Sequence, residues 1–193
     1  MAVGKREGAA VRCAPHREFE MSNWKPDPVR RVVTGHDSAN VAVTIMDGPA
    51  QNVRSRTAGT GSTLIWCTDD MPCDMPAGAQ VEDMGARILG TYPPVNGTRF
   101  IVMQVDPGTP GAMHRTETVD YIAVLEGEID MDMDDSTVRL KAGDTMVQRG
   151  TNHSWVNRGT KPCKLAIVLI DAKPLGIGHA VPRGGVAGDH AKG

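Results

Sequence analysis

The chain has 193 residues, a formal net charge of −2 and a hydrophobic fraction of 40%. This length and apolar content suit one sizeable domain with a core and argue against wholesale disorder. The near-neutral charge, without a basic stripe, argues against nucleic acid or an anionic membrane as a partner. No apolar run approaches the roughly 18 residues of a membrane span, and the N-terminal stretch lacks the apolar segment of a secretory signal, which predicts a soluble, cytoplasmic protein.

The first part of the chain predicts a polar arm followed by β-rich segments. We expect residues 1–28 to form a flexible N-terminal arm. Residues 29–97 are expected to form additional strands and loops that extend the main fold. Their β-rich runs are Val29–Asp37, Asn40–Gly48 and Ser62–Asp70, and Met71–Gly85 is expected to be a loop with a possible helical turn.

The second part has a more regular strand pattern. Residues 98–172 contain short apolar runs separated by turn residues, among them a strand at Thr98–Gly108 and a turn at Gly127. Strands at roughly 8–12-residue spacing, without a long amphipathic helix, are typical of a β-sandwich or barrel. No internal repeat is visible, so we expect a single barrel. The Gly-rich residues 173–193 are expected to form a flexible tail.

The four cysteines do not suggest a metal or disulfide framework. Cys13, Cys67, Cys73 and Cys163 contain no C-x-x-C pair. This pattern favours free thiols in a reducing compartment.

A histidine and a carboxylate share one strand phase at Gly111–Asp130. If His114 points inward, Thr116, Thr118 and Asp120 share its face, because inward positions on a strand differ by two. Glu117 is a rival carboxylate that a bulge would bring to the same side. Imidazole and carboxylate together suit a divalent transition metal, and His153 from a later strand would complete a set of two imidazoles and one carboxylate.

The spacing resembles that of the cupin superfamily. The first cupin motif is G-x5-H-x-H-x3,4-E-x6-G and the second is G-x5-P-x-G-x2-H-x3-N. The matching residues are Gly108, His114, Asp120 and Gly127 for the first motif and Gly143, Gly150, His153 and Asn157 for the second. The second match is one residue short between Gly143 and Gly150, and the resemblance covers about residues 98–172.

Three positions depart from the cupin pattern. Thr116 stands where the family usually has a second histidine, Asp120 where it has glutamate, and Gln148 where it has proline. The usual set of three histidines and one glutamate is therefore absent. The resemblance leaves His114, Asp120 and His153 as metal ligands, with Glu117 as the alternative carboxylate.

The resemblance implies an all-β double-stranded β-helix, or jelly roll, with extra N-terminal strands. It also implies one divalent metal ion (Fe, Mn, Zn or Ni) and, as in many cupins, a homodimer. The HRT…DY form of the first motif is similar to small single-domain cupins of bacteria and fungi. Some of these accompany polyketide or aromatic-degradation pathways, and some act as dehydratases or decarboxylases.

We therefore expect a metal-dependent enzyme for a small oxygenated substrate, such as a hydroxy or keto acid or a polyketide-like compound. The expected chemistry is dehydration, decarboxylation or isomerisation by Lewis-acid catalysis, with Glu117 moving a proton if it is not a ligand. The alternatives are an Fe(II)-dependent dioxygenase and a non-enzymatic small-molecule-binding cupin. Candidate substrate contacts are Gln148, Arg149, Trp155 and Thr116. Arg115 is expected to point outward into a salt bridge.

Overall fold

The computed structural model describes residues 23–78 and 81–183. These ranges contain eleven strands and one short 3-10 helix, η1 (Met84–Ala86). The strands are β1 (Arg30–His36), β2 (Ala42–Pro49), β3 (Val53–Thr57), β4 (Thr60–Thr68), β5 (Thr98–Val105), β6 (Thr118–Glu126), β7 (Glu128–Met133), β8 (Thr137–Lys141), β9 (Thr145–Arg149), β10 (His153–Val156) and β11 (Cys163–Asp171).

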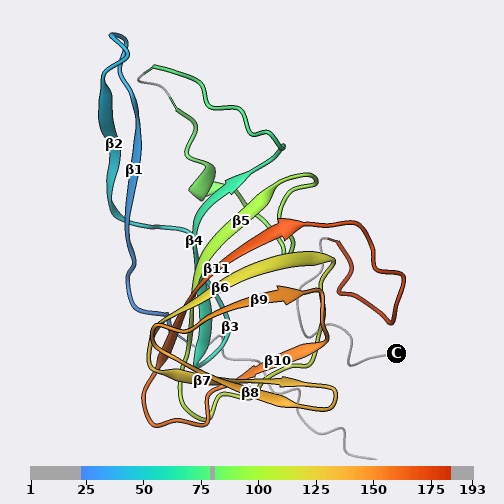
Figure 1. Ribbon diagram of the computed structural model, residues 1–193. Helices are drawn as coiled ribbons and strands as arrows, with labels where there is room; N and C mark the ends of the chain where they lie inside the picture. Colours follow the sequence, from blue (N-terminus) through green and yellow to red (C-terminus); the bar gives the residue numbers. More distant parts are fainter. Residues whose placement is uncertain (1–22, 79–80, 184–193) are drawn as a thin grey trace, which may run out of the picture.

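Two antiparallel sheets form the jelly roll predicted from the sequence. The larger sheet has the strand order β3-β4-β5-β11-β6-β9, and the smaller has the order β10-β7-β8. Figure 1 shows the smaller sheet lying beneath the larger one, with the chain crossing between them after β6 and after β9. The all-β fold class expected from the strand spacing is confirmed.

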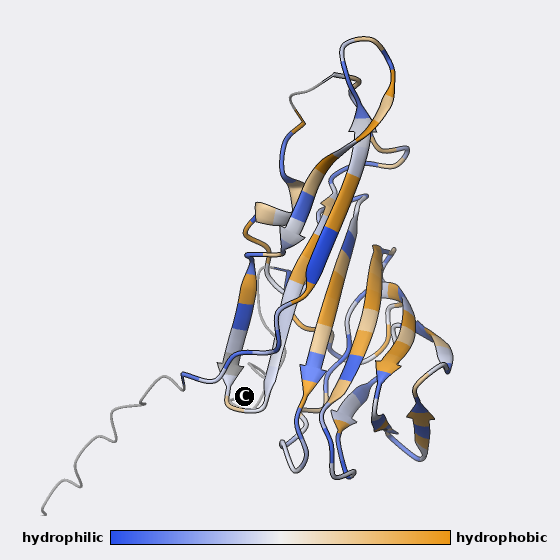
Figure 2. Cartoon of the chain, turned by 90° about the vertical axis from the view of Figure 1, so that its left-hand side faces the viewer, coloured by the Kyte–Doolittle hydropathy of each residue, from blue (hydrophilic) through white to orange (hydrophobic). Residues whose placement is uncertain are grey.

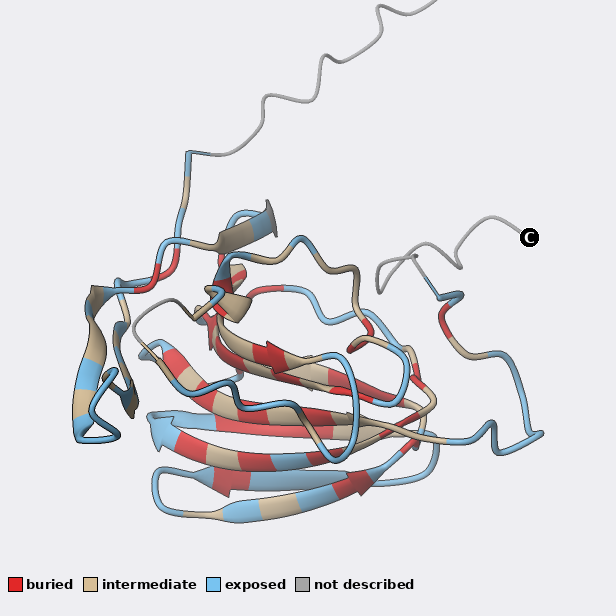
Figure 3. Cartoon of the chain, turned by 90° about the horizontal axis from the view of Figure 1, so that it is seen from above, coloured by how far each residue is buried: buried red, intermediate tan, exposed pale blue. Residues whose placement is uncertain are grey.

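The core lies between these sheets, because the strands alternate apolar and polar residues as a pleated strand requires. Leu165, Ile167 and Leu169 on β11 face inward together, and Ile122 and Val124 on β6 pack beside them. The alternation is visible as bands of hydropathy along the strands in Figure 2 and as bands of burial in Figure 3.

The N-terminal strands extend away from the barrel. β1 and β2 form a separate two-stranded ribbon, which rises above the barrel in Figure 1. An isolated ribbon is marginally stable in water, so its anchor matters. The guanidinium of Arg31 provides one, through ion pairing to Asp83 at 2.7 Å beside η1. The ribbon and the helical turn were both expected from the sequence, whereas β3 was not.

The structure describes only part of each end that was predicted to be flexible. Residues 1–22 and 184–193 lie outside the described residues. Within the expected arm, the Trp24 indole donates a hydrogen bond to Asp106 at 2.8 Å, and Asp27 pairs with Lys164 at 3.1 Å.

Residues 173–183 of the expected flexible tail are described by the structure. This segment follows the barrel back toward the strand region that precedes β6, where Val181 is 1% exposed and donates its amide hydrogen to the Arg115 carbonyl at 2.9 Å. Glycine content alone suggested disorder, but backbone hydrogen bonds and one buried valine hold the segment in place.

Candidate active site in the barrel

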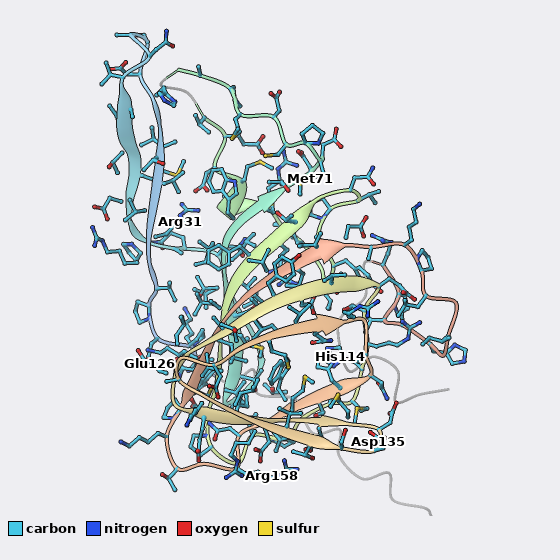
Figure 4. All side chains as sticks on the ribbon, viewed as in Figure 1. Arg31, Met71, His114, Glu126, Asp135 and Arg158 are labelled. Atoms are coloured by element: carbon cyan, nitrogen blue, oxygen red, sulfur yellow. The ribbon has the colours of Figure 1, made fainter. Side chains whose placement is uncertain are left out.

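Two histidines from distant parts of the sequence meet at one end of the barrel. The backbones of His114 and His153 exchange both hydrogen bonds, at 2.9 and 2.8 Å, in an isolated β-bridge. Their ring centroids lie 4.5 Å apart. Figure 4 places His114 beside β9 and β10, far from Glu126 at the other end of β6. The two motif histidines are therefore neighbours, as their spacing suggested.

Backbone carbonyls orient both rings. Nδ1 of His114 lies 2.9 Å from the Ala112 carbonyl, and because a carbonyl only accepts, this nitrogen carries the hydrogen. Nδ1 of His153 lies between the Thr151 carbonyl, at 3.0 Å, and the Gln148 amide nitrogen, at 2.8 Å. These two partners select opposite tautomers, so His153 has a partner in place for either position of its proton.

Burial keeps the His153 imidazole neutral. The side chain is 3% exposed, and its pKa falls to about 4, first because burial penalises the charged form and second because His114 lies beside it. At neutral pH the ring is therefore a neutral donor and acceptor of hydrogen bonds.

Asp120 and Gln148 lie on neighbouring strands of the same interior face. They are register partners in the β6–β9 pair and are 5% and 2% exposed. Oδ1 of Asp120 and Oε1 of Gln148 are both buried without a hydrogen-bond partner in the protein. Burial raises the pKa of Asp120 to about 6, although the Thr118 hydroxyl favours the charged form. Two unpartnered polar oxygens in a closed interior are costly unless a water molecule or a ligand pairs with them.

Thr116 and Trp155 complete the surroundings of the histidines. Thr116 is 2% exposed, and its hydroxyl lies 2.7 Å from that of Thr118. The Trp155 ring meets the His153 ring edge-on at 5.9 Å between centroids. Both side chains lie where the sequence placed candidate substrate contacts.

One arginine in the barrel interior, Arg99, was not predicted from the sequence. Arg99 on β5 is the register partner of Leu169 on β11, and Leu169 is the register partner of Asp120 on β6. Directly paired residues of an antiparallel sheet point to the same face, so Arg99, Leu169, Asp120 and Gln148 form one transverse row, which we call the interior row. The alternation along β5 could have identified it, because Arg99, Ile101 and Met103 lie on one face of the strand and Arg99 is the charged residue among them.

A comparison with family models finds the cupin domain at residues 101–170. A cupin-domain-containing oxidoreductase of Aspergillus ruber, fogC, is 30% identical over 76% of this chain and 74% of its own length. The chain belongs to the cupin family. The expected family is thereby confirmed on both sequence and fold.

Other relatives of this cupin come from fungal biosynthesis clusters. Phomopsin biosynthesis cluster protein C' of Diaporthe leptostromiformis is 36% identical over 82% of this chain and 86% of its own length. Among solved structures, KdgF from a Halomonas species matches with a TM-score of 0.42 and 16% identity, covering 62% of this chain and 88% of that one.

The cupin fold implies a metal ion, so the donor set was tested against one. The two imidazoles each have Nδ1 against a carbonyl, which is how metal-binding histidines are commonly oriented. A third ligand does not join them: residues 23–78 and 81–183 contain no group of three or more His, Cys, Asp or Glu side chains placed to hold a metal ion. The predicted set of His114, Asp120 and His153 is therefore not assembled, and the residues do not fit a three-ligand centre.

Glu117 lies away from the interior row. Its carboxylate pairs with Arg115 at 2.8 Å and accepts a hydrogen bond from the Leu175 amide at 2.9 Å, both outside the face of Thr116 and Thr118. The Arg115 guanidinium lowers the pKa of Glu117. No bulge brings it inward, so the predicted roles of Glu117 as proton carrier or alternative ligand need correction. Arg115 forms the expected salt bridge, but beneath the C-terminal segment, where it is 6% exposed.

Arg149 also differs from its expected place. It follows Gln148 on β9 and is exposed, since successive strand residues face opposite sides. Its predicted role as a cavity contact is not supported by this placement.

In the described part of the chain, no helix is long and apolar enough to cross a membrane.

Proposed function

We propose that this cupin is an enzyme that performs lyase-type proton transfer on a small oxygenated organic substrate such as a hydroxy or keto acid. The reaction would be a dehydration, a decarboxylation or an isomerisation. One observation carries the proposal: the Asp120 carboxyl lies in the barrel with an unpartnered oxygen, on the face that leads to Gln148 and the two imidazoles.

Asp120 is suited to give and take a proton. A general acid or base works best when its pKa lies near the working pH, and burial raises the pKa of this carboxyl to about 6. Near neutral pH it therefore exchanges between the two forms at low cost. Its unpartnered Oδ1 is the atom that would meet the substrate.

Gln148 and His153 are suited to hold the substrate oxygen. The Gln148 amide reaches His153 at 2.8 Å, and its own Oε1 has no partner among the described residues. A neutral imidazole beside an amide can donate a hydrogen bond to an oxygen that gains negative charge during the reaction. Because His153 has a partner for each tautomer, its proton can move between the ring nitrogens without loss of a hydrogen bond.

The names of three relatives favour a second candidate. Relatives from Aspergillus ruber, Neurospora crassa and Hypocrea virens are named cupin-domain-containing oxidoreductases. An oxidoreductase would include the Fe(II)-dependent dioxygenase considered from the sequence. Elemental analysis of the purified protein and oxygen uptake with substrate distinguish this candidate, since lyase chemistry consumes no oxygen.

The proposal is tested by following carbon-bound protons. A panel of small hydroxy and keto acids is incubated with the protein in deuterated water and followed by NMR for exchange, loss of water or loss of carbon dioxide. We expect turnover by the wild type and a loss of roughly 10²–10⁴-fold in the Asp120→Asn variant, the range of general acid–base catalysis. Full activity in the folded variant would contradict the proposal. No turnover with any acid, with or without added metal, would favour a non-enzymatic binding cupin.

A further inference from the structure

The outward face of the large sheet carries apolar residues where a solvated sheet usually carries polar ones. An antiparallel sheet with one face in water normally alternates apolar and polar side chains, and four strands of the large sheet depart from that pattern. Their outward positions form three transverse rows, which we call the outer patch: Thr98, Ile170, Val119 and Arg149; Phe100, Val168, Tyr121 and Val147; Val102, Ala166, Ala123 and Thr145. Arg149 is the one charged residue in these described rows.

The outer patch is open to solvent in a single chain. Tyr121 is 53% exposed and Val147 is 60% exposed, and all members of the patch except Val102 are at least partly exposed. A groove of about 370 Å³ lies on the patch, with a mainly apolar lining from β6, β9 and β11. A continuous apolar surface with an exposed aromatic side chain is typical of a place where another molecule packs.

The β1–β2 ribbon is a second part of the chain that a single copy leaves uncovered. No residue of these two described strands is buried. Val33 and Met46 are register partners, so their side chains point to the same side of the ribbon, and both remain partly exposed. Val32 is 49% exposed. Because a two-stranded ribbon is marginally stable in water, packing against another surface would stabilise it.

The area of the outer patch indicates what covers it. Neighbouring strands lie roughly 4.8 Å apart and alternate residues roughly 6.7 Å apart, so four strands and three rows give a flat area of roughly 400 Å². A stable interface buries about 800 Å² on each partner, so the patch supplies about half of that area. The ribbon, which stands out from the barrel in Figure 1, is available to supply more. A second copy of the chain offers both surfaces, so each copy can cover the other.

Charges at the two ends of the outer patch favour one orientation of the copies. Arg149 lies at the end where β6 begins, in register with Val119, and has no ion-pair partner among the described residues. Glu126 lies at the opposite end, where its exposed carboxylate shares the Lys164 ammonium with Asp27. A two-fold axis perpendicular to the strands brings the Arg149 end of each copy over the Glu126 end of the other, whereas an axis along the strands opposes arginine to arginine.

We propose that the outer patch binds the outer patch of a second copy of this chain, with the strands of the two sheets antiparallel and Arg149 of each copy facing Glu126 of the other. The β1–β2 ribbons complete the interface. The proposal is independent of the reaction in the barrel, because it rests on the outward face of the sheet and not on the interior row.

The test is the self-association of the full-length protein, measured by sedimentation velocity over a range of concentrations. Val147→Lys puts a charge into the middle row of the outer patch. Val138→Lys is the matched control, because Val138 is also an exposed valine on an edge strand, β8 of the smaller sheet. We expect the wild type and Val138→Lys to form dimers of equal affinity. The Val147→Lys dimer should be at least roughly hundredfold weaker, because an unpaired charge would be buried in it.

Two results would overturn the proposal. They are a wild type that stays monomeric at every concentration and a folded Val147→Lys variant that associates as the wild type does. If Val147→Lys does not fold, hydroxyl-radical footprinting of the wild type decides. Protection of Tyr121 that is lost on dilution to the monomer supports the interface, and equal oxidation of Tyr121 at all concentrations refutes it.

Charge reversal tests the orientation of the two copies. Arg149→Glu alone should weaken the dimer at least roughly tenfold, because it places two carboxylates opposite each other. Adding Glu126→Arg to this variant should restore the affinity. A double variant that is as weak as Arg149→Glu would overturn the antiparallel orientation.

Discussion

Arg99 and Asp120 face the barrel interior from the same transverse row, one on each side of Leu169. The distance between this cation and this carboxyl is therefore set by hydrogen-bonded strands and not by loops. Sites built on strands hold their geometry more closely than sites built on loops. The spacing of the two groups is thus a fixed property of the large sheet.

The two buried titratable groups should affect stability with opposite signs. The pKa of Asp120 rises in the fold from 3.8 to about 6, so between these values the folded state binds more protons and stability falls as pH rises. The pKa of His153 falls from 6.5 to about 4, so between these values the unfolded state binds more protons and stability rises with pH. In the wild type the two effects oppose each other.

Single substitutions should separate these effects. Relative to the wild type, Asp120→Asn should gain stability as pH rises from 4 to 6, and His153→Gln should lose it over the same window. Each change should be on the order of 3 kcal/mol at 1.36 kcal/mol per pKa unit. Urea unfolding at several pH values measures both. Parallel pH curves for the wild type and both variants would show that neither group is shifted as described.

Two motif glycines should differ in their tolerance of a side chain. Gly127 and Gly143 have φ of +72° and +94°, a region that L-residues rarely adopt. An added Cβ at Gly127 would lie 2.5 Å from the Pro162 carbonyl oxygen. An added Cβ at Gly143 would meet no other atom within 4 Å. Gly143→Ala should cost about 1–2 kcal/mol from backbone strain alone, and Gly127→Ala clearly more. Equal costs in thermal unfolding would argue against the close approach at Gly127.

The sequence predicted the barrel well because its strands carry their own signal. Alternating apolar residues in β5, β6 and β11 mark strands that are buried on one face, and the glycine turns between them are local features. β3 was missed because Val53–Thr57 reads VRSRT, with four polar residues and a single apolar one. β3 is a strand because its backbone pairs with β4, and its composition does not indicate this pairing.

The site was predicted in part, for a related reason. Phase along one strand correctly put Thr116 and Asp120 on one buried face, and motif spacing brought His114 to His153. What phase on one strand could not give is the register between strands, which places Arg99 in the row of Asp120. Nor could it show that Asp120 stops short of the imidazoles, since that depends on strand separation and side-chain length.

Glu117 should prove structural. Its carboxylate holds both Arg115 and the Leu175 amide, so Glu117→Gln would leave a buried arginine without its counter-charge. We expect a loss of about 3 kcal/mol and faster hydrogen exchange at the amides of Leu175 and Val181. Arg183→Gln is the control on the same segment, since the Arg183 side chain is 44% exposed in its pair with Asp171 and its loss should cost less than about 1 kcal/mol. A Glu117→Gln variant that keeps its stability but loses turnover would restore the catalytic role.

The centre of β11 should be the most sensitive part of the barrel to loss of side-chain volume. Leu165 is fully buried between β5 and β6, in register with Met103 and Val124. Leu165→Ala should lower the free energy of unfolding by about 2–5 kcal/mol, because the rigid sheet cannot collapse into the cavity. Leu125→Ala is the matched control, since Leu125 is 50% exposed on β6 and should change stability by less than about 1 kcal/mol. Urea denaturation of both variants measures the difference. Similar losses in the two would mean that the interior face of the large sheet is not the packed core described, and the interior row that joins Arg99 to Asp120 would lose its structural basis.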